Sequence, residues 1–196
     1  MKFDCHVHTF PRSSCSTMSP ETLIKASTEA GIEAIVITEH DYLWSADELN
    51  SLRLKCIGGL KIFAGVEVSC IDGHFLVYGL KDLKGISFNM SSEELISHAH
   101  LNGAAVVAAH PFRFSREDGQ HCYEIDIDGV EVSSGNTSNE AGRLALKLAN
   151  ERGLFQLTSS DAHTTSVIGK YHTSFPSHIS TILELAEFIR SVNKVS

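Results

Sequence analysis

Five short apolar stretches of this chain are each followed by residues that commonly bind metal ions. The groups are His6-Val7-His8, Glu39-His40-Asp41, Glu67, His110 and Asp161-Ala162-His163. Short apolar runs without a helical period predict buried strands, and in barrel-like α/β proteins the C-terminal ends of parallel strands open on one face. The sequence therefore predicts that these distant segments meet in one polynuclear metal site.

The His6-Val7-His8 motif places two imidazoles on the same face of a strand, because side chains in a strand repeat every two residues. With 11 histidines in the chain, this motif alone is weak, and a half-buried histidine beside a surface histidine is the ordinary alternative. The interpretation of this pair as metal ligands is supported by His40, His110 and Asp161-Ala162-His163, which lie at other predicted strand ends. Imidazole combined with carboxylate favours Zn, Mn or Fe over Ca or Mg.

Several further side chains allow more than one interpretation. His74 stands at the start of a predicted strand rather than at its end, so the pattern alone leaves its role as a ligand open. Glu131 ends another predicted strand and could bind metal, accept a histidine N–H or serve the fold, and we favour the acceptor role. His98 and His100 lie on a predicted helix, where this spacing points them apart, so we expect them on the surface.

Length, charge and cysteine content narrow the class of protein. The 196 residues suit a single domain, 1–196, with one core. A formal net charge of −8 argues against a stable nucleic-acid complex or binding to an anionic membrane, since both need a basic surface. Five cysteines without a CxxC motif predict free thiols in a cytoplasmic protein. We find no signal-peptide pattern and no apolar stretch long enough to span a bilayer.

Helix signals alternate with the predicted strands. The segments Ser19-Pro20-Glu21 and Ser91-Ser92-Glu93-Glu94 resemble helix starts, residues 139–151 have an apolar helical face, and a last helix is predicted to begin near Ser180. Seven strands are predicted, at residues 1–5, 34–38, 62–68, 74–78, 104–109, 129–133 and 154–158. This alternation predicts βα units, a mainly parallel sheet and a small irregular barrel. Residues 112–128 are predicted to form a surface loop near the site.

Five motifs follow one another across nearly the whole chain. They are Phe3-Asp4-Cys5-His6-Val7-His8-Thr9, Ile37-Thr38-Glu39-His40-Asp41, Gly65-Val66-Glu67, Ala109-His110-Pro111 and Ser159-Ser160-Asp161-Ala162-His163. As an ordered set, though not singly, they resemble the PHP (polymerase and histidinol phosphatase) family. The resemblance implies an α/β fold, a distorted (β/α)₇ barrel, with a trinuclear metal centre at the C-terminal ends of the strands. It also implies phosphoesterase activity.

The same resemblance implies which side chains would hold the metal ions. The first ion would take His6, His8, Glu67 and Asp161, the second would share Glu67 and add His74 and His110, and the third would take His40, His163 and one residue from the loop after His8. Cys15 is the best match for that loop position, where the family usually has Asp or His. A thiolate is a good Zn ligand, whereas an unliganded Cys15 would leave the third site weak or empty. The implied cofactors are two or three divalent ions of Zn, Mn or Fe.

Two further departures from the family pattern bear on the substrate. Glu39 stands where the family usually has Asp, next to a ligand position. The larger inserted domain that some relatives carry between His74 and His110 is absent. A substrate inferred from those larger enzymes therefore does not transfer to this chain.

The implied reaction is hydrolysis of a small phosphorylated substrate, either a phosphomonoester or a small nucleotide. Neighbouring divalent ions lower the pKa of a shared water and supply a bridging hydroxide beside Glu67, with Asp161 in the same centre. Arg113 and Lys170 are the candidate phosphate contacts, and Arg12 is a third; the alternative for each is a solvated surface charge. Asp41 could protonate a leaving oxygen or orient a ligand, and we favour orientation.

Two other functions fit part of the sequence. An amidohydrolase-type barrel also begins with HxH after its first strand, but such barrels are usually longer, and their metal-bridging carboxylated lysine has no obvious counterpart here. A non-catalytic metal-binding PHP module is the second alternative, and the near-complete ligand set argues against it. The sequence shows no convincing Ser-His-Asp arrangement for nucleophilic catalysis.

Overall fold

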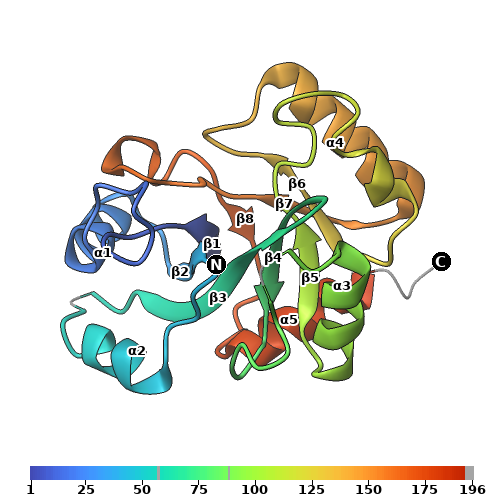
Figure 1. Ribbon diagram of the computed structural model, residues 1–196. Helices are drawn as coiled ribbons and strands as arrows, with labels where there is room; N and C mark the ends of the chain where they lie inside the picture. The colour runs from blue at the N-terminus through green and yellow to red at the C-terminus, as the bar shows by residue number, and fades with distance from the viewer. Residues whose placement is uncertain (57, 88, 193–196) are drawn as a thin grey trace.

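The computed structural model describes residues 1–56, 58–87 and 89–192, and its single mixed sheet curls into a nearly closed barrel (Figure 1). The strands are β1 (Lys2–Val7), β2 (Ala34–His40), β3 (Lys61–Cys70), β4 (Gly73–Tyr78), β5 (Ala105–Ala108), β6 (Gly129–Ser133), β7 (Phe155–Thr158) and β8 (Thr173–Ser174). Their order in the sheet is β7-β6-β5-β4-β3-β2-β1-β8. A parallel bridge between Val7 and Ala162 joins β1 to the segment after β7. The predicted α/β barrel is confirmed.

The direction of β4 differs from the mainly parallel sheet that the sequence predicts. Strands β1, β2 and β3 are parallel, and so are β5, β6 and β7, but β4 runs antiparallel to both of its neighbours. Only two residues, Ile71 and Asp72, separate β3 from β4. Two residues suffice for a hairpin but not for a parallel crossover. The start of β4 therefore lies at the same rim as the C-terminal ends of β3 and β5.

In the part of the chain that the structure describes, five α-helices surround the sheet (Figure 1). They are α1 (Pro20–Glu29), α2 (Ala46–Arg53), α3 (Ser92–Leu101), α4 (Asn139–Arg152) and α5 (Ile182–Val192). The side chains of Ser19 and Ser91 accept backbone N–H groups at the starts of α1 and α3, as the sequence predicts. Helix α2 and strand β8 were not predicted, although Ser45 and Glu48 form a capping box at the start of α2.

Among the described residues, the buried hydrophobic side chains form three clusters. One cluster contains Phe3 of β1, Tyr78 of β4, Phe155 of β7 and Leu185 of α5, which places α5 at the barrel end away from the strand ends predicted to hold metal. The other two clusters lie between the sheet and the outer helices. The cluster beneath α3 and α4 also buries part of the segment predicted as a surface loop. The buried residues of that segment are Phe112, Cys122, Ile125 and Ile127. That prediction is therefore only partly right, because apolar side chains anchor the loop.

Cysteine and membrane predictions can also be compared with the structure. All five cysteines are free thiols, as expected. Within the described ranges, no helix has the length and apolar character needed to cross a bilayer. The described residues also form two short 3₁₀ helices, η1 (Gln120–Tyr123) between β5 and β6 and η2 (Thr165–Val167) between β7 and β8.

An irregularity in β1 turns the histidines toward the site. The register between β1 and β2 shifts between Asp4 and Val7, so β1 carries one extra residue there. Cys5 packs in the cluster inside the barrel, whereas Val7 packs with the outer cluster under α1. A β-bulge reverses the alternation of side chains in this way and commonly re-aims side chains beside functional sites. His6 and His8 consequently face the rim instead of the outer helix layer.

The hydroxyl of Tyr78 connects β4 to β1 across the barrel interior. It donates a hydrogen bond of 2.9 Å to the backbone carbonyl of Cys5, the residue before His6, and Tyr78 is fully buried. We predict that Tyr78→Phe lowers the free energy of unfolding by about 1 kcal/mol, because the carbonyl loses a partner that water cannot replace. Urea unfolding measures this loss. The control is Tyr42→Phe, whose hydroxyl bonds the more accessible Glu48; an equal loss in both variants would contradict the prediction.

Candidate metal centre

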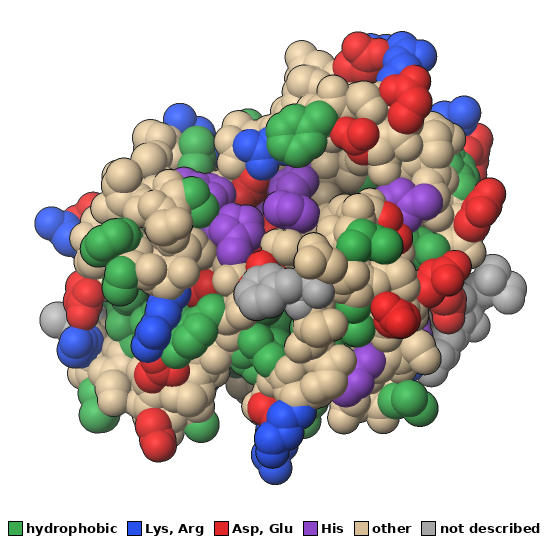
Figure 2. Space-filling model, in the orientation of Figure 1, with side chains coloured by type: hydrophobic (Ala, Val, Ile, Leu, Met, Phe, Trp, Pro, Cys, Tyr) green, Lys and Arg blue, Asp and Glu red, His purple; other side chains and the backbone are tan. Residues whose placement is uncertain are grey.

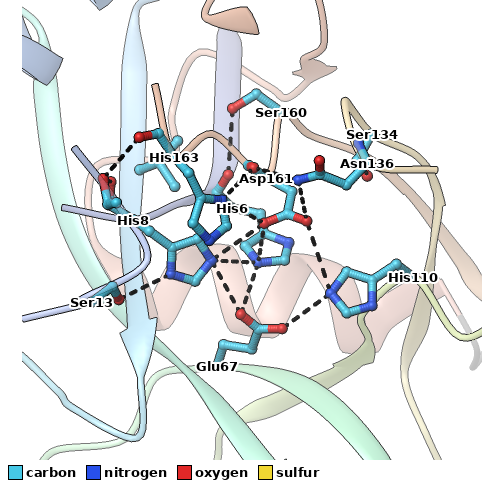
Figure 3. A network of polar contacts seen from close by, with 12 residues as sticks. His6, His8, Ser13, Glu67, His110, Ser134, Asn136, Ser160, Asp161 and His163 are labelled. Carbon is cyan, nitrogen blue, oxygen red and sulfur yellow. Dashed lines mark hydrogen bonds and ion pairs between the residues drawn. The ribbon is translucent and has the colours of Figure 1, made fainter. Parts of the chain in front are cut away.

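Eight of the predicted ligands converge on one rim of the barrel. Figure 3 labels His6, His8, Glu67, His110, Asp161 and His163 among them. Four overlapping groups have ligand atoms within 4.8 Å of one another: His8, His40 and His163; His6, His110 and Asp161; His6, His8 and Glu67; and His40, Glu67 and His74. Because the groups share members, they form a single cluster. Figure 2 shows histidine side chains gathered in a hollow on this face. The segments thus meet as the sequence predicts.

The topology explains why His74 joins the other ligands. His6 and His8 lie at the end of β1, His40 ends β2, and Glu67 lies in the last part of β3. His74 is the second residue of β4, which runs in the opposite direction. The start of β4 thus reaches the same rim, so His74 lies among the other candidate ligands, and its role as a ligand stays a prediction.

Glu67 is at the centre of the cluster and is completely buried. Five imidazole nitrogens surround its carboxylate: Nε2 of His6, Nε2 of His8 and Nδ1 of His40, each at 3.1 Å, Nδ1 of His74 at 2.9 Å and Nε2 of His110 at 3.2 Å. Burial would raise the pKa of Glu67, but His6, His110 and His74 together hold it well below its usual value. The carboxylate is therefore ionised and available to bridge cations.

Asp161 forms the opposite wall of the cluster. Its Oδ1 lies 3.4 Å from Nε2 of both His6 and His8, and its Oδ2 accepts a hydrogen bond of 2.8 Å from Asn136. The guanidinium of Arg113 approaches Oδ2 at 3.7 Å. Burial opposes ionisation of Asp161, but the neighbouring His6 and His8 lower its pKa below the ordinary value. A second carboxylate is thus held ionised beside the same two imidazoles.

The hydrogen bonds of His6 and His8 leave two lone pairs facing each other. Nδ1 of His6 lies 3.0 Å from the Glu131 carboxylate, and Nδ1 of His8 lies 3.2 Å from the Ser13 hydroxyl, which itself donates to Glu39 at 2.6 Å. Both Nδ1 atoms therefore carry the proton in the neutral rings. Their Nε2 atoms are only 3.0 Å apart, and in the neutral rings both would be unprotonated. A divalent cation held by these atoms and Glu67 would offset the repulsion between the two lone pairs, so the donor set fits divalent metal ions.

Burial and charge affect the imidazoles of the cluster differently. Burial alone would lower the pKa of His6, but the negative charges of Asp161, Glu131 and Glu67 raise it well above the ordinary value. In His40, burial dominates and lowers the pKa to about 4. Burial and the nearby His8 likewise lower the pKa of His163. His40 and His163 are therefore neutral at physiological pH, as metal binding requires.

Unusual backbone conformations also concentrate at this rim. Positive φ angles occur at Asp41 (53°), His110 (32°) and Asp161 (49°). Non-glycine residues rarely adopt such angles and do so mainly where the surrounding structure holds them. Asp41 accepts a hydrogen bond of 2.8 Å from the backbone N–H of Ser69, so it ties the end of β2 to β3. This contact braces the neighbouring ends of β2 and β3, and the orienting role that we favoured for Asp41 stays a prediction.

Other candidates are placed less favourably than the eight ligands. Cys15 is exposed and lines the same cavity as His40 and His163, but it belongs to none of the four groups found among the described residues. Burial raises the pKa of its thiol, so metal would have to displace a proton there. Lys170 is exposed and does not line this cavity, and Arg12 pairs with Glu48 at 2.7 Å. Of the three candidate phosphate contacts, only Arg113 lies beside the cluster.

Two predictions about residues outside the ligand set have opposite outcomes. Glu131 accepts from His6 and also from the backbone N–H of His110 at 3.2 Å, which matches the acceptor role that we favoured. His100 was expected on the surface, but only 20% of its side chain is exposed and its Nε2 lies 2.9 Å from Asp128. The helix spacing gave no sign of that partner, because Asp128 comes from a different part of the chain.

The sequence did not predict the hydrogen bonds by which three residues hold the candidate ligands in place. Asn136 donates to both the carboxylate and the carbonyl of Asp161. Ser13 accepts from the backbone N–H of His40 as well as from His8. Glu39, fully buried, accepts from Ser13, from Thr9 and from the indole N–H of Trp44. Asn136 follows β6 at a strand end and could have been found by the rule that located the candidate ligands. The sequence singled out Glu39 beside His40 but gave it no such role, and Ser13 had no comparable signal.

The Ser13 hydroxyl provides a direct test of ligand positioning. We predict that Ser13→Ala weakens metal binding by about 10- to 100-fold, because His8 loses the acceptor that fixes its protonated nitrogen. Competition against a chelator, followed by elemental analysis, measures the loss without any substrate. Ser13→Thr keeps a hydroxyl and should restore much of the affinity, and the exposed neighbour Ser14→Ala is the control. Unchanged affinity in Ser13→Ala would rule out this role.

Comparisons with known proteins find relatives in sequence and in fold. An uncharacterised protein of Methanocaldococcus jannaschii is 28% identical over 145 residues, covering 67% of this chain and 81% of that protein. Structures with a similar fold include a candidate metal-dependent phosphoesterase of Bifidobacterium adolescentis (TM-score 0.67, 18% identity, 97% of this chain and 94% of that one). An amidohydrolase of Chromobacterium violaceum with bound sulfate and no metal has a TM-score of 0.66 at 17% identity, covering 96% of this chain and 97% of that one.

A third similar structure is a two-domain protein of Bacteroides vulgatus that contains a candidate PHP-like metal-dependent phosphoesterase. It has a TM-score of 0.61 at 20% identity, and the match covers 83% of this chain and 52% of that one. The family model described as the PHP domain matches residues 4–186, a span that includes all eight ligands of the cluster. The resemblance drawn from the five sequence motifs is thereby confirmed, and the chain belongs to the PHP domain family.

Proposed function

We propose that this PHP domain hydrolyses a small phosphomonoester, using two or three divalent ions of Zn, Mn or Fe. Membership of the family and the similar structures support the broader class, a metal-dependent hydrolase. The observation that carries the finer proposal is Glu67, a buried carboxylate surrounded by five imidazoles, of which His40, His74 and His110 line a cavity. Ions bound there would lower the pKa of a water and offset the charge of a phosphoryl group.

The cavity above the cluster suits a phosphate dianion. This site cavity, of about 520 Å³, is lined by His40, Asp161, Arg113, Asn136 and Ser166 among others. A guanidinium binds phosphate oxygens in a geometry that a single ammonium cannot match. Arg113 is held in place between Asp161 and the ring of Phe114, whose centroid is 5.2 Å away. The hydroxyl of Ser166 adds a neutral hydrogen-bonding group on the same wall.

Two alternatives from the sequence have less support. The amidohydrolase reading has one structural neighbour of that name, but among the described residues lining the site cavity there is no lysine to serve as a carboxylated metal bridge. A non-catalytic metal-binding module would not need a phosphate-binding cation at the mouth of the cavity. Turnover of p-nitrophenyl phosphate but not of simple amides by the metal-loaded protein would separate phosphoesterase from amidohydrolase.

The first test of the proposed function combines activity with metal counting. We predict that protein loaded in turn with Mn, Zn and Fe hydrolyses p-nitrophenyl phosphate with at least one of these metals, with two or three ions bound per chain. Asp161→Ala should lower kcat at least about 100-fold, because the reacting centre loses a ligand and a charge, while circular dichroism stays native. His178→Ala, a change at an exposed loop histidine, serves as the control. No hydrolysis with any of the three metals would reject the phosphoesterase proposal.

The pH dependence follows from the shifted pKa values. Without metal, the carboxylates raise the pKa of His6, His8 and His74, so these rings retain protons that metal must displace. Lower pH therefore favours the metal-free form, and we predict that activity falls below about pH 6. A rate profile at fixed free metal concentration, together with an indicator that detects proton release on metal addition, measures this. A rate that stays constant down to about pH 4.5 would contradict the assignment.

A further inference from the structure

A second cavity adjoins the candidate metal centre. This side cavity has a volume of about 460 Å³ and lies between the turn after β3, the start of β4, the end of β5 and the segment 113–122. It shares His74, His110 and Arg113 with the site cavity. A group bound at Arg113 and the histidine cluster therefore extends directly into the side cavity, and its volume suits a small organic group.

The charges that line the side cavity are mostly negative. Asp72 and Asp118 are both on its wall, and among the described lining residues Arg113 is the one Lys or Arg side chain. The hydrogen bonds that hold these two carboxylates in position come from neutral groups and not from a cation. Asp72 accepts from the backbone N–H and hydroxyl of Ser92, and Asp118 accepts from those of Ser115. These hydrogen bonds hold the carboxylates in position and leave their negative charge in place.

Apolar surface completes the side cavity. The side chains of Ile71 and Phe114 are 67% and 84% exposed, and both line it. Phe75, which is buried, forms part of the inner wall and contacts His121 edge-to-face with ring centroids 6.2 Å apart. Large exposed apolar side chains beside a polar centre are typical of ligand-binding clefts. The cavity thus offers apolar surface together with hydrogen-bond acceptors.

We propose that the side cavity binds the alcohol part of the phosphoester and selects a neutral or cationic, partly apolar group. This inference rests on the proposed function and adds the substrate class to it. In the reaction, the oxygen of water forms a bond to phosphorus, the bond from phosphorus to the alcohol oxygen breaks, and that oxygen leaves as the protonated alcohol. Arg113 contacts the phosphoryl group at the junction, and Asp118 and Asp72 repel a second anion beyond it. Substrates with an additional phosphate or carboxylate are disfavoured.

Three aryl phosphates with different charges test the proposal on the metal-loaded enzyme. Phenyl phosphate has a neutral ring, 4-carboxyphenyl phosphate adds a negative charge, and tyramine phosphate adds a positive one. We expect kcat/KM for the cationic compound to exceed that for the anionic compound by about tenfold or more, since a unit charge near a carboxylate in a partly desolvated cavity interacts on that scale. High salt should reduce the ratio.

Variants assign the selectivity to this cavity. Asp118→Asn should reduce the ratio of cationic to anionic substrate by about threefold or more, and Asp118→Lys should invert it, because the charge facing the substrate is removed or reversed. The kcat/KM for phenyl phosphate should change little in either variant. Asp126→Asn is the matched control, since it removes the same charge from a side chain that is 91% exposed and does not line the side cavity.

The outcomes separate this inference from the proposed function. Hydrolysis of the aryl phosphates without a charge preference would overturn the inference and leave the phosphoesterase standing, and so would an equal effect of Asp126→Asn and Asp118→Asn. Failure to hydrolyse any of the three compounds with Mn, Zn or Fe would reject the proposed function itself. Thermal unfolding of each variant shows whether a changed ratio reflects a folded protein.

Discussion

The organisation of this protein depends on one buried carboxylate. Glu67 has no exposure to solvent, and an ionised carboxylate is stable in such a place only when opposite charges or hydrogen bonds surround it. Five imidazoles provide that environment, but they cannot all be protonated at once because their own charges would repel. Divalent cations between the carboxylate and the neutral rings satisfy both requirements. The remaining features of the rim serve to bring these groups together.

The barrel supplies the rigid platform that such a cluster needs. Its interior is packed with apolar side chains, and α5 closes the end of the barrel opposite the candidate metal centre. This packing holds the strand ends that carry the candidate ligands in position. Local irregularities then aim the ligands: the bulge in β1 redirects His6 and His8, and positive φ angles at His110 and Asp161 turn those side chains inward. Strain of this kind persists only where the surrounding structure enforces it.

The contacts around the ligands divide the site into functional parts. Glu131 and Ser13 fix the protonated nitrogens of His6 and His8, which leaves the other nitrogens free for metal. Arg113 stands where the site cavity and the side cavity meet, so one cation can orient the phosphoryl group relative to both. Beyond it the surface changes from cationic to acidic and apolar. Under the proposed function, phosphate and the group attached to it would be bound by separate surfaces.

The sequence by itself determined the chemistry of the site and most strand positions, because ligand types and apolar periodicity are local properties of a chain. The same local signals placed His6 and Asp161 at strand ends. Tertiary structure alone decided whether His74 reaches the cluster, since that depends on the direction in which β4 pairs. It also distinguished Arg113 from Lys170, which have equal charge and follow His110 and His163 in the sequence. Strand pairing and long-range contacts leave no local periodicity in the chain, and for that reason only the folded structure reveals them.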